Sequence, residues 1–179
     1  VMSSKKYYPC TDIFARVEKY DLPLGQYAVF GSSLMDVWGI RPAKDLDIIV
    51  TPELFEKLKS REGWEYIQAN GFGIMRNGEA DVTTIQERPT DGDYHPDRLA
   101  MIREARVIQG VPFVSIKEVI ACKTAYNRQK DLDDIAAIQS YLQDHPNDNF
   151  EFDTSPPAGG STDFVIERNE LTAQLVIGQ

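Results

Sequence analysis

The stretch of residues 45–50, DLDIIV in one-letter code, constrains the fold of this chain more than any other part of it. On a β-strand, residues i and i+2 point to the same face, roughly 6.5 Å apart along the backbone. Asp45 and Asp47 therefore share one face, and Leu46, Ile48 and Val50 occupy the other. Two ionised carboxylates so close together repel each other unless a cation lies between them. Oxygen ligands of this kind suit Mg²⁺ or Mn²⁺, and the apolar end of the strand predicts a buried position, where a bare pair is costly.

A second feature lies just upstream of this strand. The apolar run 27–30 stops at Gly31, Ser32 and Ser33, which lead into a predicted short helix. A phosphate chain can rest on the backbone N–H groups of such a turn. A metal site beside a phosphate cradle indicates phosphoryl or nucleotidyl transfer. The alternative is a solvated strand face, because 28 acidic residues in a chain of 179 produce Asp-x-Asp pairs by chance.

Length and composition predict one soluble domain with a real core. A chain of 179 residues with 42% hydrophobic residues suits a domain over 1–150, followed by a linker and a short C-terminal hairpin or tail over 151–179. No apolar stretch approaches the roughly 20 residues that span a membrane. The N-terminal segment has positive charge without a following apolar region, so no signal peptide is expected. Cys10 and Cys122 are far apart and predict reduced thiols in a cytoplasmic protein.

The net charge of −9 argues against nonspecific binding to nucleic acid, because the long-range field repels polyanions. It leaves room for a nucleotide, since local cations and a divalent metal can reverse the field inside a cleft.

Helices and strands alternate in the predicted pattern, which indicates an α/β or α+β fold. Predicted helices cover 11–20, 32–38, 51–60, 96–103, 115–126 and 130–142, and predicted strands cover 26–30, 45–50, 64–68, 72–76, 79–85 and 106–108. The clearest local signals are the helix start Thr51-Pro52, the Asn77-Gly78 hairpin turn and a capping box from Ser115. Residues 86–96 are predicted as a loop over the cleft. Two short strands, 164–166 and 171–177, or a disordered tail, are expected after the linker.

Asp81 is the third candidate acid. It alternates with apolar residues along its strand, and if this strand lies beside 45–50 then three carboxylates meet at one point. Such a set can hold two divalent ions about 4 Å apart for an in-line displacement, and Asp81 could also take the proton of an attacking hydroxyl. Glu79 is the substitute candidate on the same face. The alternative is that Asp81 is a surface residue of the hairpin.

Further candidates are the cations of the last two predicted helices and of the loop before Asp45. Helical spacing places Lys123 on an inward, apolar stripe, where it meets either a triphosphate or a structural salt bridge. The segment 128–135 carries Arg128, Lys130, Asp131 and Asp134. We expect these residues to form an ion-pair cluster at the helix junction, to lie beside a nucleotide, or to do both. Arg41 and Lys44, before Asp45, either contact phosphates or offset the nearby acids.

These residues give the chain a resemblance to the nucleotidyltransferase superfamily, the fold of DNA polymerase beta. Phe30-Gly31-Ser32, twelve intervening residues and Asp45-Leu46-Asp47-Ile48 match the first motif of that family, and Asp81 matches its later strand-borne acid. Lys123 with the segment 128–135 resembles the ending of minimal nucleotidyltransferases and AbiE-type toxins. The match covers about residues 26–142. The chain departs from the family in lacking the added C-terminal domain of AbiE-type toxins and in having Ala43 where many relatives carry Thr or Ser.

The resemblance implies a mixed β-sheet with helices packed on one face, a terminal helical pair, two Mg²⁺ (or Mn²⁺) ions and an NTP. Asp45 and Asp47 would be metal ligands, Asp81 a ligand or base, and Gly31 and Ser32, with Ser33, would hold the triphosphate. Lys123, Arg128 and Lys130 would complete the nucleotide site. The expected activity moves an NMP to a hydroxyl acceptor (protein, RNA or small molecule) and releases pyrophosphate. The alternatives are a non-catalytic nucleotide-binding or toxin–antitoxin module and a purely structural domain, and a homodimer through the C-terminal segment is expected as one arrangement.

Overall fold

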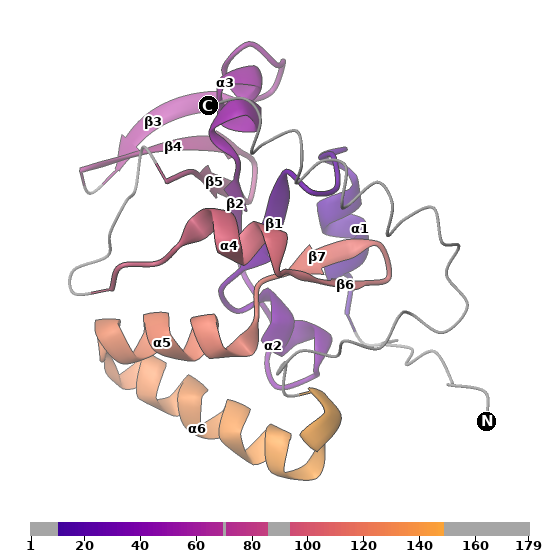
Figure 1. Ribbon diagram of the computed structural model, residues 1–179, viewed down its shortest axis with the longest axis vertical. Helices are drawn as coiled ribbons and strands as arrows, with labels where there is room; N and C mark the ends of the chain where they lie inside the picture. Colours follow the sequence, from indigo (N-terminus) through magenta and orange to yellow (C-terminus); the bar gives the residue numbers. More distant parts are fainter. Residues whose placement is uncertain (1–10, 70, 86–93, 149–179) are drawn as a thin grey trace. The chain divides into compact units, whose positions relative to one another are not determined.

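Seven strands form one mixed β-sheet in a computed structural model that describes residues 11–69, 71–85 and 94–148 (Figure 1). The order across the sheet is β3-β4-β5-β2-β1-β7-β6. The strands are β1 (Tyr27–Phe30), β2 (Leu46–Val50), β3 (Glu65–Ala69), β4 (Phe72–Asn77), β5 (Ala80–Thr83), β6 (Arg106–Ile108) and β7 (Val111–Phe113). Two pairs, β1–β7 and β2–β5, are parallel and the other four are antiparallel. The predicted mixed sheet is therefore confirmed.

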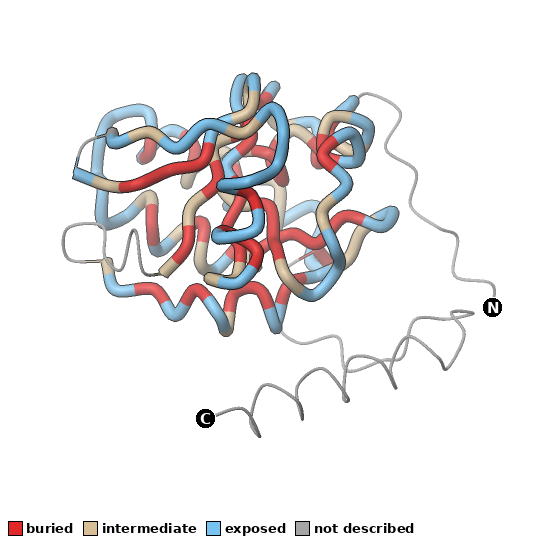
Figure 2. Tube along the Cα trace, turned by 90° about the horizontal axis from the view of Figure 1, so that it is seen from above, coloured by how far each residue is buried: buried red, intermediate tan, exposed pale blue. Residues whose placement is uncertain are grey.

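Six helices accompany the sheet within the described residues. They are α1 (Ile13–Glu18), α2 (Ser33–Val37), α3 (Pro52–Lys59), α4 (Arg98–Arg103), α5 (Ile116–Tyr126) and α6 (Gln129–Asp144), with a 3₁₀ turn, η1, at Pro146–Asp148. Figure 2 shows the buried residues concentrated along the inner strands and on the inward sides of the helices. No helix in this part of the chain is both long enough and apolar enough to cross a bilayer.

The central strand β2 has apolar residues on both faces, and this decides where the helices lie. Leu46, Ile48 and Val50 pack into the large core with residues of α1, α2 and α3. Ile49 points the other way and packs with Met101 and other residues of α4 and β1. The expectation of helices on one face thus holds for α1, α2 and α3, but α4 covers the opposite face, because alternate residues of a strand face opposite sides (Figure 1).

The helix start at Thr51 forms as predicted, whereas the hairpin turn lies one residue later and the capping box at Ser115 forms only in part. The Thr51 hydroxyl accepts a hydrogen bond from the Leu54 N–H at 3.3 Å and caps α3, whose first residue is Pro52. The β4–β5 hairpin forms, but its turn is Gly78-Glu79 and not Asn77-Gly78, because Asn77 ends β4 and is paired with Ala80. Gly78 has φ +57°, a left-handed conformation that glycine adopts without strain. The Ser115 hydroxyl accepts from the Glu118 N–H and caps α5.

The helical pair α5–α6 closes the described chain as predicted. A left-handed Asn127 (φ +51°) ends α5. A capping box then starts α6, because Asp131 accepts from the Arg128 backbone N–H at 3.1 Å and the Arg128 guanidinium binds the same carboxylate. Most of the predicted loop over the cleft, residues 86–93, and the two predicted C-terminal strands lie outside the described residues. The described residues belong to one compact unit, 8–150.

Candidate active site

The turn after β1 lies against the second acid of the Asp-x-Asp pair. Phe30 ends β1 and is paired across the sheet with Asp47 on β2. The next residue, Gly31, has φ +73°, and a Cβ atom placed on it would lie 2.8 Å from Asp47 Oδ2. A side chain here would strain the left-handed backbone and would force the Asp47 carboxylate to move, so this position strongly favours glycine. The Gly31 turn and the Asp47 carboxylate therefore form one local unit.

Both acids of the pair are exposed rather than buried. Asp45 lies one residue before β2, and Asp47 is the exposed position in an otherwise buried strand. The expectation that burial makes the bare pair costly is therefore wrong, because the face of β2 that carries the carboxylates opens to solvent at this end. The proximity of the two like charges remains, and exposure makes both carboxylates accessible to a cation and its ligands.

The loop that carries Asp45 is fixed by hydrogen bonds from neighbouring elements. The Arg16 guanidinium, on α1, donates to the carbonyl oxygens of Ala43 and Lys44 at 3.0 Å each. The Ala43 N–H donates to the Asp36 carboxylate at 2.8 Å. These contacts hold the approach to β2 from both sides, so the position of Asp45 is set by the fold.

Asp81 lies directly beside Asp47, as the strand pattern predicts. Strands β2 and β5 are parallel neighbours, and Asp47 is paired with Asp81. Both oxygens of the Asp81 carboxylate, however, accept from Arg76 on β4, at 2.6 and 2.7 Å. Within the described ranges, no group of three His, Cys, Asp or Glu side chains stands close enough together to hold a metal ion. The third acid is thus adjacent to the pair but bound to an arginine.

Glu79 does not serve as a substitute for Asp81. Its carboxylate accepts from Arg16 at 2.8 and 3.0 Å and from Lys19 at 2.9 Å, so it is bound to α1. Hydrogen bonding from Arg16 lowers the pKa of Glu79 against the opposing effect of burial, and Lys19 lowers it further. The sequence expectation fails here because the residue lies in the hairpin turn rather than in β5, and the face rule for strands does not extend to it.

A cleft of about 570 Å³ contains most of the predicted site residues. Its lining consists of Phe30, Gly31, Ser32, Arg41, Lys44, Asp45, Asp47, Val119, Cys122, Lys123, Tyr126, Arg128, Lys130, Asp131, Asp133 and Asp134. Asp81 and Ser33 are outside this lining. The Ser33 side chain is buried, and its hydroxyl has no hydrogen-bond partner among the described residues, so the predicted contact of this hydroxyl with a triphosphate does not fit its position.

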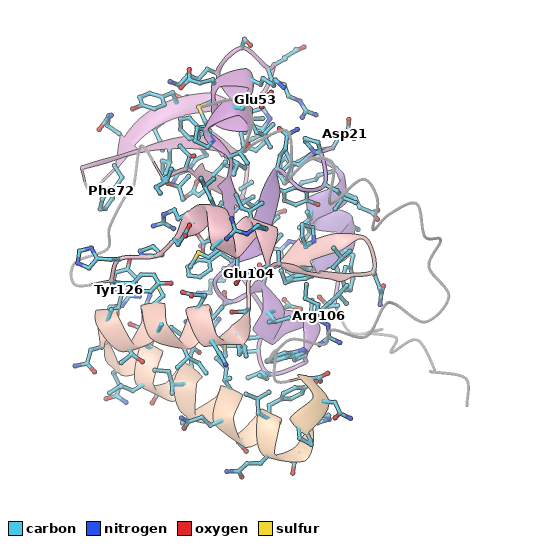
Figure 3. All side chains as sticks on the ribbon, in the orientation of Figure 1. Asp21, Glu53, Phe72, Glu104, Arg106 and Tyr126 are labelled. Carbon is cyan, nitrogen blue, oxygen red and sulfur yellow. The ribbon has the colours of Figure 1, made fainter. Side chains whose placement is uncertain are left out.

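Three lining residues of α5 were absent from the sequence prediction. Val119, Cys122 and Tyr126 lie at positions −4, −1 and +3 relative to Lys123, which places all four on one face of the helix. Helical spacing around Lys123 could have found them. Tyr126, labelled in Figure 3, lies at the end of α5 that leads to α6, and the Arg128 guanidinium carbon is 4.8 Å from the centre of its ring.

A cluster of ion pairs forms the α5–α6 side of the cleft. The Asp134 carboxylate accepts from Arg41 at 2.6 and 2.7 Å and from Lys123 at 2.6 Å. Burial alone would raise the pKa of Asp134, but the hydrogen bonds from Arg41 and Lys123 outweigh it and hold the pKa at about 2. Hydrogen bonding from Arg128 likewise lowers the pKa of Asp131 against burial. Lys123 therefore forms the structural salt bridge that was one of its two predicted roles, and its side chain also lines the cleft.

The cleft is electrically balanced, unlike the chain as a whole. Five cationic and five acidic side chains line it, whereas the chain carries a net charge of −9. Lys44 and Lys130 make no ion pair within the part of the chain that the structure describes. An anionic ligand therefore meets less repulsion here than at the average surface, and two lysines can pair with it directly.

The low pKa of Asp134 predicts a specific loss of stability in acid. Because this pKa is lower in the folded chain than the ordinary value of 3.8, the stabilisation is full above about pH 4 and is lost as the pH falls through about 2. We expect the difference in unfolding free energy between the wild-type protein and Asp134→Asn to shrink by about 2 kcal/mol over this window. Urea denaturation at pH 7, 4 and 2.5 measures it, and a difference that stays constant with pH would contradict the assignment.

Comparisons with known proteins give little beyond the structure. No protein family matches the sequence, and no curated protein is similar enough to count as a relative. A crystal structure of ANT(2")-Ia in complex with adenylyl-2"-tobramycin aligns over 91% of this chain and 94% of its own, with 14% identity and a TM-score of 0.35. A likeness at this level supports no conclusion about function.

Proposed function

We propose that the chain is a metal-dependent nucleotidyltransferase, which moves an NMP from an NTP to a hydroxyl acceptor and releases pyrophosphate. One observation carries the proposal: Gly31 leaves no space for a side chain against the Asp47 carboxylate, at the edge of a cleft lined by five cations. A backbone turn that must approach a carboxylate this closely suits a ligand that needs both a phosphate cradle and a metal ion.

The donor set fits Mg²⁺ or Mn²⁺. Asp45 and Asp47 present exposed carboxylate oxygens on one face, and Asp81 is the neighbour of Asp47 across the parallel pair. Mg²⁺ is usually bound by one or two carboxylates together with substrate phosphates, rather than by a complete cage of protein ligands. A pair of carboxylates with a third nearby therefore suffices before the substrate arrives. The bound metal would neutralise charge on the phosphates of the substrate.

The remaining cleft residues suit the binding of the triphosphate, and Asp81 suits the role of proton acceptor. Backbone N–H groups of the turn at Gly31 and Ser32 are at hand for phosphate oxygens, and Lys44 and Lys130 supply positive charge. Lys123 and Arg128 also line the cleft, where they form ion pairs with Asp134 and Asp131, respectively. In the proposed reaction the acceptor hydroxyl oxygen forms a bond to the α-phosphorus. The bond from that phosphorus to the bridging oxygen breaks, pyrophosphate leaves with the electron pair, and the hydroxyl proton passes to Asp81.

A nucleotide-binding module without turnover is the second candidate. One observation favours it: Arg76 binds both oxygens of Asp81, so the acid assigned to the reaction is occupied in the present conformation. A toxin–antitoxin module is one form of this second candidate, because the segment 123–134 resembles the corresponding segment of AbiE-type toxins. Both candidates share the same nucleotide site and differ in turnover.

Incubation of the protein with each of the four α-³²P-labelled NTPs, Mg²⁺ and a mixture of protein, RNA and small-molecule acceptors tests the proposal. We expect pyrophosphate release and label transfer that stop when EDTA removes the metal. Mg²⁺-dependent NTP binding with no transfer to any acceptor would favour the non-catalytic module. Absence of both binding and transfer would contradict both candidates.

A further inference from the structure

A cation, two acids and the glycine turn follow one another across the sheet. Arg76 on β4 is paired with Asp81 on β5, Asp81 with Asp47 on β2, and Asp47 with Phe30 on β1. Cross-strand partners lie on the same face of a sheet, in strands roughly 4.8 Å apart. Gly31 continues from the end of this row. Along this row of cross-strand partners the charges run positive, negative, negative, and Arg76 is next to Asp81.

Electrostatic repulsion between the two acids explains why Arg76 lies beside Asp81 in the metal-free protein. Like charges that lie directly opposite on neighbouring strands destabilise a sheet. Asp47 and Asp81 are such a pair, and Arg76 offsets the repulsion by binding both oxygens of Asp81 at 2.6 and 2.7 Å. The contact occupies both oxygens of the Asp81 carboxylate. Hydrogen bonding from Asp81 raises the pKa of Arg76 against the opposing effect of burial, and the charges of Asp81, Asp45 and Glu65 add to the rise.

We propose that Arg76 is a latch on Asp81, and that Asp81 either pairs with Arg76 or joins Asp45 and Asp47 around a divalent cation. This inference rests on the proposed function, because it concerns the same metal site. It makes Arg76 a positioning residue, which acts on the metal through Asp81 and sets how readily the third carboxylate becomes available. The Arg76 side chain is 46% exposed and that of Asp81 is 30% exposed, so solvent screens the pair and the latch is easily opened.

The latch predicts that weakening Arg76 strengthens metal binding. We expect Arg76→Gln to bind Mn²⁺ about two- to fivefold more tightly than the wild-type protein, which is the range that an exposed ion pair is worth. Arg76→Lys should fall between the two, because lysine cannot make the bidentate contact. Both side chains are exposed, so these variants should fold. Electron paramagnetic resonance of free Mn²⁺ during a titration without nucleotide measures the affinity, independently of any activity.

A double-mutant cycle separates the latch from a general effect of charge. The affinities are measured for the wild-type protein, Arg76→Gln, Asp81→Asn and the double variant. If Arg76 acts through Asp81, most of the gain from Arg76→Gln disappears in the Asp81→Asn background. An equal gain in both backgrounds, or no gain in either, would overturn the latch.

The same titration distinguishes failure of the latch from failure of the proposed function. Mn²⁺ binding by the wild-type protein that is weakened by Asp47→Asn establishes the metal site, and the cycle then decides on Arg76 alone. If neither the wild-type protein nor Arg76→Gln binds Mn²⁺ at millimolar concentration, both the metal-dependent function and the latch are contradicted.

Discussion

Asp47→Asn should transfer NMP at least about 100-fold more slowly than the wild-type protein, while its stability changes little. Loss of partners that only support metal ligands typically costs 10- to 100-fold, so loss of a ligand itself should cost at least the upper end of that range. Stability should change by no more than about 0.5 kcal/mol, because Asp47 is exposed, asparagine keeps the size of the side chain, and the change removes a like charge directly opposite Asp81. Label transfer and urea denaturation, measured side by side, check the two parts of this expectation.

Glu79→Gln is the matched control for Asp47→Asn. Glu79 is an acid of the neighbouring β4–β5 hairpin, but its carboxylate is bound to Arg16 and Lys19 and is not part of the cleft lining. We expect this variant to lose up to about 1 kcal/mol of stability, the value of partly exposed ion pairs, and to retain its transfer rate. Equal losses of activity in the two variants would show that a general change in charge, and not the position of Asp47, is responsible.

Gly31→Ala should abolish transfer as thoroughly as the change at Asp47, and it should also destabilise the fold. The new Cβ atom would lie 2.8 Å from Asp47 Oδ2, so the carboxylate or the turn must move. A displacement of about 1 Å in a reacting site can cost 100-fold in rate. The left-handed backbone adds about 1–2 kcal/mol of strain for any residue with a Cβ. Transfer assays and urea denaturation measure both effects.

Gly39→Ala separates the two consequences of the change at Gly31. Gly39 has almost the same backbone, with φ +74° against +73°, but a Cβ atom placed there meets nothing within 4 Å. Both variants should therefore lose similar stability from backbone strain, and only Gly31→Ala should lose activity and metal-dependent nucleotide binding. If Gly39→Ala loses activity to the same extent, strain alone accounts for the result and the contact with Asp47 has no special role.

Short-range signals made much of the fold predictable. The signals at Thr51, Asn77-Gly78 and Ser115 each depend on residues within four positions of one another. The cap at Thr51 formed as expected, the hairpin formed with its turn one residue later, and Ser115 caps its helix with one of the two hydrogen bonds of a capping box. The shared face of the acids follows from the two-residue period of a strand, and the parallel pairing of β2 with β5 places Asp81 beside Asp47. Short-range signals and the two-residue period of strands were thus enough to predict the sheet and the approximate position of the acids.

Long-range contacts account for what the sequence did not reveal. Glu79 is bound by Arg16, 63 positions away, and no local pattern indicates that partner. The exposure of Asp47 depends on how α5 and α6 border the cleft, which no strand pattern specifies. The packing of α4 on the second face of the sheet rests on a few residues of a six-residue helix. The Arg76–Asp81 pair depends on the register of the hairpin, in which Gly78 and Glu79 form the turn; the predicted turn at Asn77-Gly78 would have placed Arg76 opposite Glu79 instead.

Calorimetric titration of the wild-type protein with a non-hydrolysable NTP, in the presence of Mg²⁺ and then of EDTA, tests most directly whether the Gly31 turn and the Asp47 carboxylate form a metal–nucleotide site. We expect one nucleotide to bind per chain with Mg²⁺, and binding to weaken strongly with EDTA or in Asp47→Asn. Binding of equal strength with and without the metal, or no binding at millimolar nucleotide, would contradict the account.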